Sequence, residues 1–233
     1  MITEDMHVHS TFSDGANTIE ENVQRAVAMG LKRICCVDHV RVGTTWVPEM
    51  VAEVKRLRLE YPIEILCAVE AKFLDANGRL DCPANLPSGV DHIYAADHQV
   101  PLGDACYKPG EVIDAMATMT ISKDQVLAQL VKATVSAMRN YDNVVIAHLF
   151  SILPKIGIGE NEVSLALLEQ IAEAAVETNT PIEIDERWKC PGLRSVVLLK
   201  SMGVDIWFST DSHKVSDIGK YSYASKIYRA VAA

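Results

Sequence analysis

The segment Met6-His7-Val8-His9-Ser10-Thr11-Phe12-Ser13-Asp14-Gly15 lies a few residues from the N-terminus. It has the pattern of a strand that ends in two histidines and is followed by a turn carrying an aspartate. Because residues two apart on a strand project to the same side, His7 and His9 can bind one ion. A strand and turn can form without these polar residues, so the segment predicts a functional site at the end of a strand.

Six further segments follow a related pattern, in which a short apolar run stops at polar or charged residues. They span residues 33–39, 63–70, 90–98, 144–148, 181–185 and 204–211. Amphipathic patterns and capping residues predict helices over 18–30, 48–61, 122–140, 162–178, 193–202 and 222–231. Turn-forming residues predict a small hairpin or surface loop over 74–90 and a loop over 101–110.

Strands that alternate with helices favour a parallel α/β fold over a sandwich, and seven such strands predict a closed or nearly closed barrel. The apolar content of 49% with only 6% aromatic residues suits parallel strands covered by helices. At 233 residues, and without a linker long enough to divide it, the chain is expected to form a single domain over residues 1–233.

The composition argues against several classes of protein. A net charge of −9 and a pI of about 5.2 speak against a long nucleic-acid partner, because phosphate-backbone binders concentrate Lys and Arg on one face. No uncharged apolar segment reaches the roughly 18 residues that a membrane helix needs. The six cysteines show no CxxC pairing and are interpreted as small, mostly buried apolar residues. We therefore expect a soluble, cytoplasmic protein with reduced cysteines and no membrane partner.

Six of the seven histidines fall at or just past the end of a predicted strand, and only His92 is expected within one. A single histidine at a strand end is more often a hydrogen-bonded structural residue, but six in the same position are hard to explain in that way. In parallel barrels the functional residues collect at the carboxyl ends of the strands. Carboxylates occur at the same ends, and histidine with carboxylate but without thiolate suits Zn, Mn or Fe.

These motifs occur in a specific order. After the opening segment come Asp38-His39, Val69-Glu70, Asp97-His98, Ala147-His148 and Ser209-Thr210-Asp211-Ser212-His213. In this order they resemble the PHP (polymerase and histidinol phosphatase) superfamily, over residues 5 to about 214. The third and fourth motifs depart from frequent family forms, with Ala68-Val69 where a glycine is common before the acid and Ala96-Asp97-His98 in place of Ser-Val-His.

The resemblance implies a distorted seven-stranded β/α barrel, similar to a TIM barrel, with two or three divalent metal ions at its C-terminal rim. It further implies that one ion binds His7, His9, Glu70 and Asp211, and that Glu70 bridges to a second ion held by His98 and His148. A third ion would bind Asp14, His39 and His213. Asp97 has two open interpretations, a partner that orients an imidazole or a surface residue.

The resemblance also implies the hydrolysis of a phosphate ester of a small metabolite by a hydroxide that the metal ions activate. Glu70 and Asp211 are the predicted catalytic residues, although a metal-bound water or another histidine could equally protonate the leaving group. Arg187, Arg194 and Lys214 are the predicted substrate-binding residues. Two alternatives remain, which are hydrolysis of short oligonucleotides or nucleotides at the same cluster and a non-catalytic metal-binding scaffold.

Overall fold

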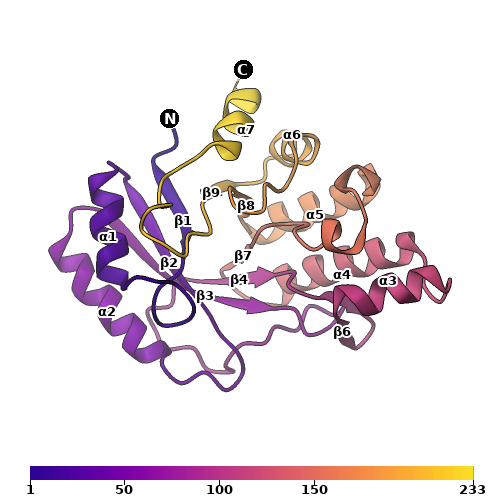
Figure 1. Ribbon diagram of the computed structural model, residues 1–233, viewed down its shortest axis with the longest axis horizontal. Coiled ribbons are helices and arrows are strands. Elements are labelled where there is room, and N and C mark those ends of the chain that lie inside the picture. The colour runs from indigo at the N-terminus through magenta and orange to yellow at the C-terminus, as the bar shows by residue number, and fades with distance from the viewer. Residues whose placement is uncertain (233) are drawn as a thin grey trace.

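The computed structural model describes residues 1–232. Within them, seven parallel strands form one curved sheet in the spatial order β1-β2-β3-β4-β7-β8-β9, and two short strands form a separate antiparallel hairpin (Figure 1). The strands of the large sheet are β1 (Glu4–Val8), β2 (Arg33–His39), β3 (Glu64–Lys72), β4 (His92–Ala96), β7 (Val144–Ile146), β8 (Ile182–Asp185) and β9 (Ile206–Ser209). The hairpin consists of β5 (Val100–Leu102) and β6 (Ala105–Tyr107).

The two ends of the large sheet meet, which nearly closes the barrel. Val8 at the end of β1 forms a parallel bridge with Ser212, and the backbone N–H of His9 donates to the carbonyl oxygen of Ser212 over 2.8 Å. Below this contact, the buried Asp5 carboxylate accepts hydrogen bonds from both the backbone N–H and the hydroxyl of Thr210, over 2.9 and 2.6 Å. The predicted parallel barrel is therefore confirmed.

The helices lie outside the sheet (Figure 1). They are α1 (Ile19–Ala28), α2 (Val47–Glu60), α3 (Pro109–Ala117), α4 (Lys123–Asn140), α5 (Leu165–Thr178), α6 (Leu193–Ser201) and α7 (Tyr223–Ala232), with the 3₁₀ turns η1 (Leu153–Ile156) and η2 (Glu160–Glu162). Helices α1 to α6 lie in connections between strands, and α7 follows the last strand, β9. The predicted caps are present, because the Thr18 and Ser122 side chains accept from the backbone N–H groups of Glu21 and Gln125.

The structure differs from the sequence prediction in three places. The hairpin β5–β6 begins at Val100 and, together with the start of α3 at Pro109, occupies the stretch predicted as a loop over 101–110. Helix α5 begins at Leu165 rather than residue 162, because the Ser164 side chain caps it by accepting from the N–H of Leu167. His92 is the first residue of β4 and therefore lies at its amino end.

The strands contribute to three apolar clusters, of which the smallest joins Ile184 of β8 to α6 and α7. One face of the sheet packs against the surrounding helices, and the other forms a small cluster inside the barrel that includes Met6, Val37, Tyr94 and Trp207. The barrel interior is therefore filled by side chains, and the site lies above it at the strand ends.

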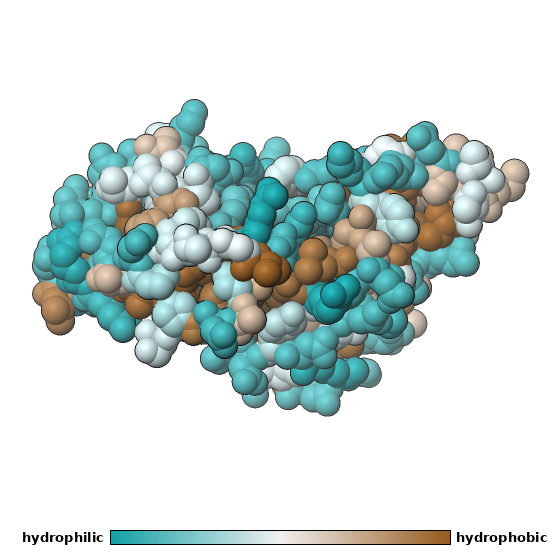
Figure 2. All heavy atoms as spheres, turned by 90° about the horizontal axis from the view of Figure 1, so that it is seen from below, coloured by the Kyte–Doolittle hydropathy of each residue, from teal (hydrophilic) through white to brown (hydrophobic). Residues whose placement is uncertain are grey.

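The burial of four of the six cysteines agrees with the prediction that most of them are buried. Figure 2 shows one face of the molecule, on which hydrophilic residues predominate and hydrophobic residues form smaller patches. All six cysteines are free thiols, of which Cys35, Cys36, Cys67 and Cys190 are buried. No helix formed by residues 1–232 is both long and apolar enough to cross a membrane.

Candidate metal centre

All nine predicted metal ligands lie together at the carboxyl ends of the strands, and Glu70 near the end of β3 is their hub. We refer to these residues as the cluster: His7, His9, Asp14, His39, Glu70, His98, His148, Asp211 and His213. Glu70 is only 2% exposed, and its two carboxylate oxygens face different neighbours. Oε1 lies 3.0 Å from Nε2 of both His98 and His148. Oε2 lies 2.7 Å from Nδ1 of His39 and 3.5 Å from Nε2 of both His7 and His9.

His7, His9 and Asp211 form one buried part of the cluster. Each is at most 5% exposed, and their ligand atoms lie within 4.8 Å of one another. Oδ1 of Asp211 is 3.1 Å from Nε2 of His9. His7 and His9 project to the same side of β1, as their spacing predicted, and their rings lie 4.8 Å apart.

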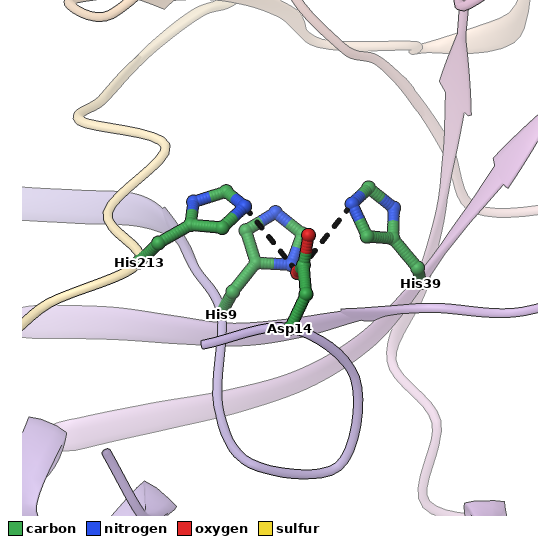
Figure 3. Close-up of side chains that lie close together, drawn as sticks. All are labelled: His9, Asp14, His39 and His213. Carbon is green, nitrogen blue, oxygen red and sulfur yellow. Dashed lines mark ion pairs between the residues drawn. The ribbon is translucent and has the colours of Figure 1, made fainter. Parts of the chain in front are cut away.

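A second, more open part of the cluster surrounds Asp14 (Figure 3). Oδ1 of Asp14 lies 3.3 Å from Nε2 of His213 and 3.7 Å from Nε2 of His39. Nδ1 of His9 is also 3.7 Å from the same oxygen, and these four residues could hold one metal ion. How the nine residues divide among individual ions stays a prediction.

The hydrogen-bond pattern tests whether the cluster suits a metal. Among the side chains of residues 1–232, seven buried N or O atoms lack a hydrogen-bond partner. Five of them belong to the cluster, namely Nε2 of His7, both ring nitrogens of His9, Oε2 of Glu70 and Oδ1 of Asp211. A buried polar atom without a partner is costly, by about 1–3 kcal/mol. Because these atoms converge from four residues, the donor set fits metal ions.

The charges around the buried histidines also fit a metal site. Burial alone would lower the pKa of His7, but the negative charges of Glu183 and Glu70 outweigh it and raise the pKa well above its ordinary value. Burial likewise opposes protonation of His148, yet hydrogen bonds to Asp97 and Glu70 raise its pKa. For His7 and His148 the neighbouring carboxylates thus outweigh desolvation, whereas burial lowers the pKa of His9. Buried negative charge therefore surrounds the imidazoles of His7 and His148, and cations can balance it.

Two carboxylates behind the cluster orient its histidines. Glu183 on β8 is fully buried, with Oε1 3.0 Å from Nδ1 of His7, and its Oε2 accepts the backbone N–H of His148 over 2.7 Å. Asp97 is 4% exposed and lies 3.2 Å from Nδ1 of His148, so it orients an imidazole and is not a surface residue. Such partners fix the ring and its tautomer, which leaves the other nitrogen for the metal.

Asp38 fixes the loop that carries Asp14. Its buried carboxylate accepts hydrogen bonds from the backbone N–H and hydroxyl groups of Ser10 and Ser13, at distances of 2.5–3.2 Å. The loop then returns tightly against β1 at Gly15, where an added Cβ would stand 2.5 Å from the carbonyl oxygen of His9. Only glycine fits there without a shift of the backbone.

Two cluster residues have strained backbones. His148 has a φ of 29° and Asp211 a φ of 48°, in the left-handed region that side chains other than glycine rarely adopt. Such conformations cost about 1–3 kcal/mol each and persist where the surroundings impose them. Their occurrence at two predicted ligands is typical of a functional site.

A cleft of about 480 Å³ opens over the cluster and is lined by six of its residues together with Arg41, Lys72, Arg187 and Trp188. Of the predicted substrate-binding residues, Arg187 lies at this cleft, and its guanidinium donates to the carbonyl oxygen of Asp211 over 3.3 Å. Lys214 lines an adjoining pocket. Arg194 lies at a different pocket and donates to the carbonyl oxygen of Val163, so the structure does not bring it to the cluster.

Comparisons with known proteins agree with this geometry. A family model described as the PHP domain matches residues 5–187, which include seven of the nine cluster residues. A probable phosphatase of Caldanaerobacter subterraneus subsp. tengcongensis is 27% identical, over 96% of this chain and 81% of its own length. The DNA polymerase/3'-5' exonuclease PolX of Bacillus subtilis is also 27% identical, over 91% of this chain and 34% of that protein. Among solved structures, a candidate histidinol phosphatase from Listeria monocytogenes superposes with a TM-score of 0.71 at 14% identity, covering 95% of this chain and 99% of that one, which shows a shared fold.

Proposed function

Because the chain belongs to the PHP domain family, we propose that it is a metal-dependent phosphomonoesterase that acts on small phosphorylated metabolites. Family membership and the similarity to proteins named probable phosphatases support the phosphoesterase class. The observation that carries the proposal is the set of unpartnered buried atoms of His7, His9, Glu70 and Asp211, which face one centre beneath an open cleft.

The cluster residues would hold two or three divalent ions such as Zn, Mn or Fe, which supply an activated water and offset the charge of the phosphate. With three ions the centre would carry +6 from the ions, −3 from the carboxylates of Asp14, Glu70 and Asp211 and −1 from the hydroxide, which leaves about +2. The centre therefore attracts an anionic substrate even though the chain has a net charge of −9. Glu70 would hold ions through its two oxygens, which lie 2.7–3.5 Å from ring nitrogens of five histidines. Asp211 would hold an ion through Oδ1 while its Oδ2 accepts from Trp188, so a water at the centre or a histidine would protonate the leaving group.

Arg187 is the side chain that we assign to the substrate phosphate. Its guanidinium lies at the cleft and is 46% exposed, so its donors can reach an incoming anion. Lys214 in the adjoining pocket is a second cation within the same region. A guanidinium presents paired N–H groups that match the oxygens of a phosphate.

A second candidate function is the hydrolysis of short oligonucleotides or nucleotides. It is favoured by the similarity to a DNA polymerase and exonuclease, which covers 91% of this chain. A volume of about 480 Å³ and the acidic net charge favour the smaller substrate. A non-catalytic scaffold is disfavoured because no cluster residue is missing.

The first test measures the metal content of the purified protein and its hydrolysis of p-nitrophenyl phosphate with Mn²⁺ or Zn²⁺. We expect at least two metal ions per chain and turnover that a chelator abolishes. Screening phosphorylated metabolites against short oligonucleotides then separates the two candidate functions. Fewer than two bound ions and no chelator-sensitive turnover would refute the enzyme.

Matched variants test the site. His9→Ala should abolish turnover, whereas His92→Ala removes a histidine at the amino end of β4 and should leave turnover unchanged. Arg187→Met should raise KM, and Arg194→Met should leave KM unchanged because Arg194 lies at a separate pocket. Equal effects of the two arginine variants would contradict the assignment of Arg187.

A further inference from the structure

Trp188 is a large aromatic residue that does not belong to the buried apolar clusters of the fold. It lies in the turn that follows β8, is 40% exposed, and lines the cleft over the cluster. Its indole Nε1 donates a hydrogen bond to Oδ2 of Asp211 over 2.9 Å. Nζ of Lys155 lies 3.9 Å from the centre of the ring and supports it from one face. The ring is therefore fixed although it is partly exposed.

The turn that carries Trp188 is fixed from the barrel side. Oδ1 of Asp185, the last residue of β8, accepts the backbone N–H of Trp188 over 2.7 Å. The backbone N–H of Asp185 in turn donates to the carbonyl oxygen of Cys190 over 2.8 Å, which closes the turn. Asp185 is fully buried. The backbone position of Trp188 is thus set by β8, independently of Asp211.

The indole divides the two oxygens of Asp211 between different neighbours. Oδ2 receives the N–H of Trp188, while Oδ1 is buried, lacks a hydrogen-bond partner among residues 1–232, and lies 3.1 Å from Nε2 of His9. Because an indole N–H is a donor only, it cannot compete for a metal. Without it, the carboxylate could rotate about its last bond and exchange its oxygens.

We propose that Trp188 is a positioning residue that holds the Asp211 carboxylate with Oδ1 directed at the metal centre. The inference deepens the proposed function and rests on the same centre. It assigns Trp188 no contact with the reacting atoms. Trp188 would orient Asp211 through a hydrogen bond, as Glu183 orients His7. Because Trp188 also lies at the cleft, metal binding should change the environment of its indole.

The test compares Trp188→Phe with Trp207→Phe. Trp207 is the matched control, because its Nε1 also donates to an aspartate, Oδ2 of Asp205, over 2.9 Å, in a pocket that contains no cluster residue. Competition with a chromophoric chelator gives the affinity for Mn²⁺ or Zn²⁺ without any need for turnover. We expect Trp188→Phe to weaken the affinity of one ion by about 10- to 100-fold and Trp207→Phe to leave it unchanged.

A second measurement uses fluorescence and tests the proposal if Trp188→Phe does not fold. In the variant Trp46→Phe/Trp207→Phe, Trp188 is the remaining tryptophan of the chain. Addition of metal should change its emission, and the Asp211→Asn substitution in the same background should reduce that change. Equal metal affinities for the two single variants, or an emission that metal does not alter, would overturn the proposal.

The outcomes separate this inference from the proposed function. If the protein binds metal and Trp188→Phe weakens binding, but no phosphate ester is cleaved, the positioning role stands and the phosphatase proposal fails. If phosphate esters are cleaved and Trp188→Phe matches Trp207→Phe in both metal affinity and kcat, the phosphatase proposal stands and the positioning role fails.

Discussion

Oε1 of Glu183 lies 3.0 Å from Nδ1 of His7, and both side chains are completely buried. The other oxygen of the same carboxylate accepts the backbone N–H of His148 over 2.7 Å. One residue that is not itself a predicted ligand therefore orients two that are. Since β8 carries Glu183 and the ligands lie on β1 and after β7, this carboxylate joins strands that are distant in the sequence.

We predict that Glu183→Gln lowers the metal affinity by about 10- to 100-fold. The amide can accept from His7 with its oxygen only if its NH₂ group faces the N–H of His148, where two donors oppose each other. Chelator competition measures the affinity, and Glu64→Gln at the exposed start of β3 is the control. The same affinity in both variants would contradict the role of Glu183.

Removal of metal should destabilise the fold. The cluster concentrates carboxylates and unpartnered imidazole nitrogens that metal ions would satisfy. At a free metal concentration of 100 times Kd, binding contributes about 2.7 kcal/mol, which corresponds to roughly 5–10 °C in the unfolding midpoint of a chain of this size. Thermal unfolding with and without chelator checks this shift, and His9→Ala should show a smaller one. An identical midpoint in both conditions would argue against a structural contribution of the metals.

Asp38→Ala should loosen the loop that carries Asp14. Four donors of Ser10 and Ser13 lose their shared acceptor, and we expect a loss of about 3 kcal/mol in the free energy of unfolding. Urea unfolding measures the loss, with Asp142→Ala, at an exposed aspartate, as the control. A loss no larger than that of the control would show that the loop does not depend on Asp38.

His92, which lies outside the cluster, should make the free energy of unfolding depend on pH. Burial lowers its pKa below the ordinary value, more than the carbonyl of Asn143 and the charge of Asp91 raise it. The unfolded chain then binds a proton at higher pH than the folded one, so the contribution of His92 is complete well above the unfolded pKa of about 6.5 and is lost as the pH falls through it. The free energy of unfolding of the wild type relative to His92→Gln should therefore decline as the pH is lowered through about 6.5. A constant difference would contradict this prediction.

The barrel and the cluster could be predicted from the sequence because both depend on local patterns. Apolar runs that stop at His39, Glu70 or His148 mark buried parallel strands, and their polar ends necessarily meet at one rim. The resemblance of the motifs to the PHP superfamily then indicated which of these residues belong together. The helix caps Thr18 and Ser122 could be predicted because they depend on residues three positions away.

The supporting residues could not be predicted because their partners are far away in the sequence. Glu183 contacts a residue 176 positions away, and within its strand it is one acidic side chain among apolar ones. A buried acid in an apolar strand was a usable signal, since such a charge needs a partner. Trp188 gave no such signal, because its role depends on the turn that places it. The hairpin β5–β6 was interpreted as a loop because its strands have only three residues each.

The contact between β1 and residues 210–212, which joins the two ends of the sheet, has a consequence during synthesis. At about 5–20 residues per second, the ribosome adds Asp211 and His213 roughly 10–40 s after His7 and His9. Until then β1 has a free edge, and no nascent chain can offer the complete set of ligands. Full metal binding would therefore require synthesis to pass His213, and any chain that ends before Asp211 should carry an incomplete centre.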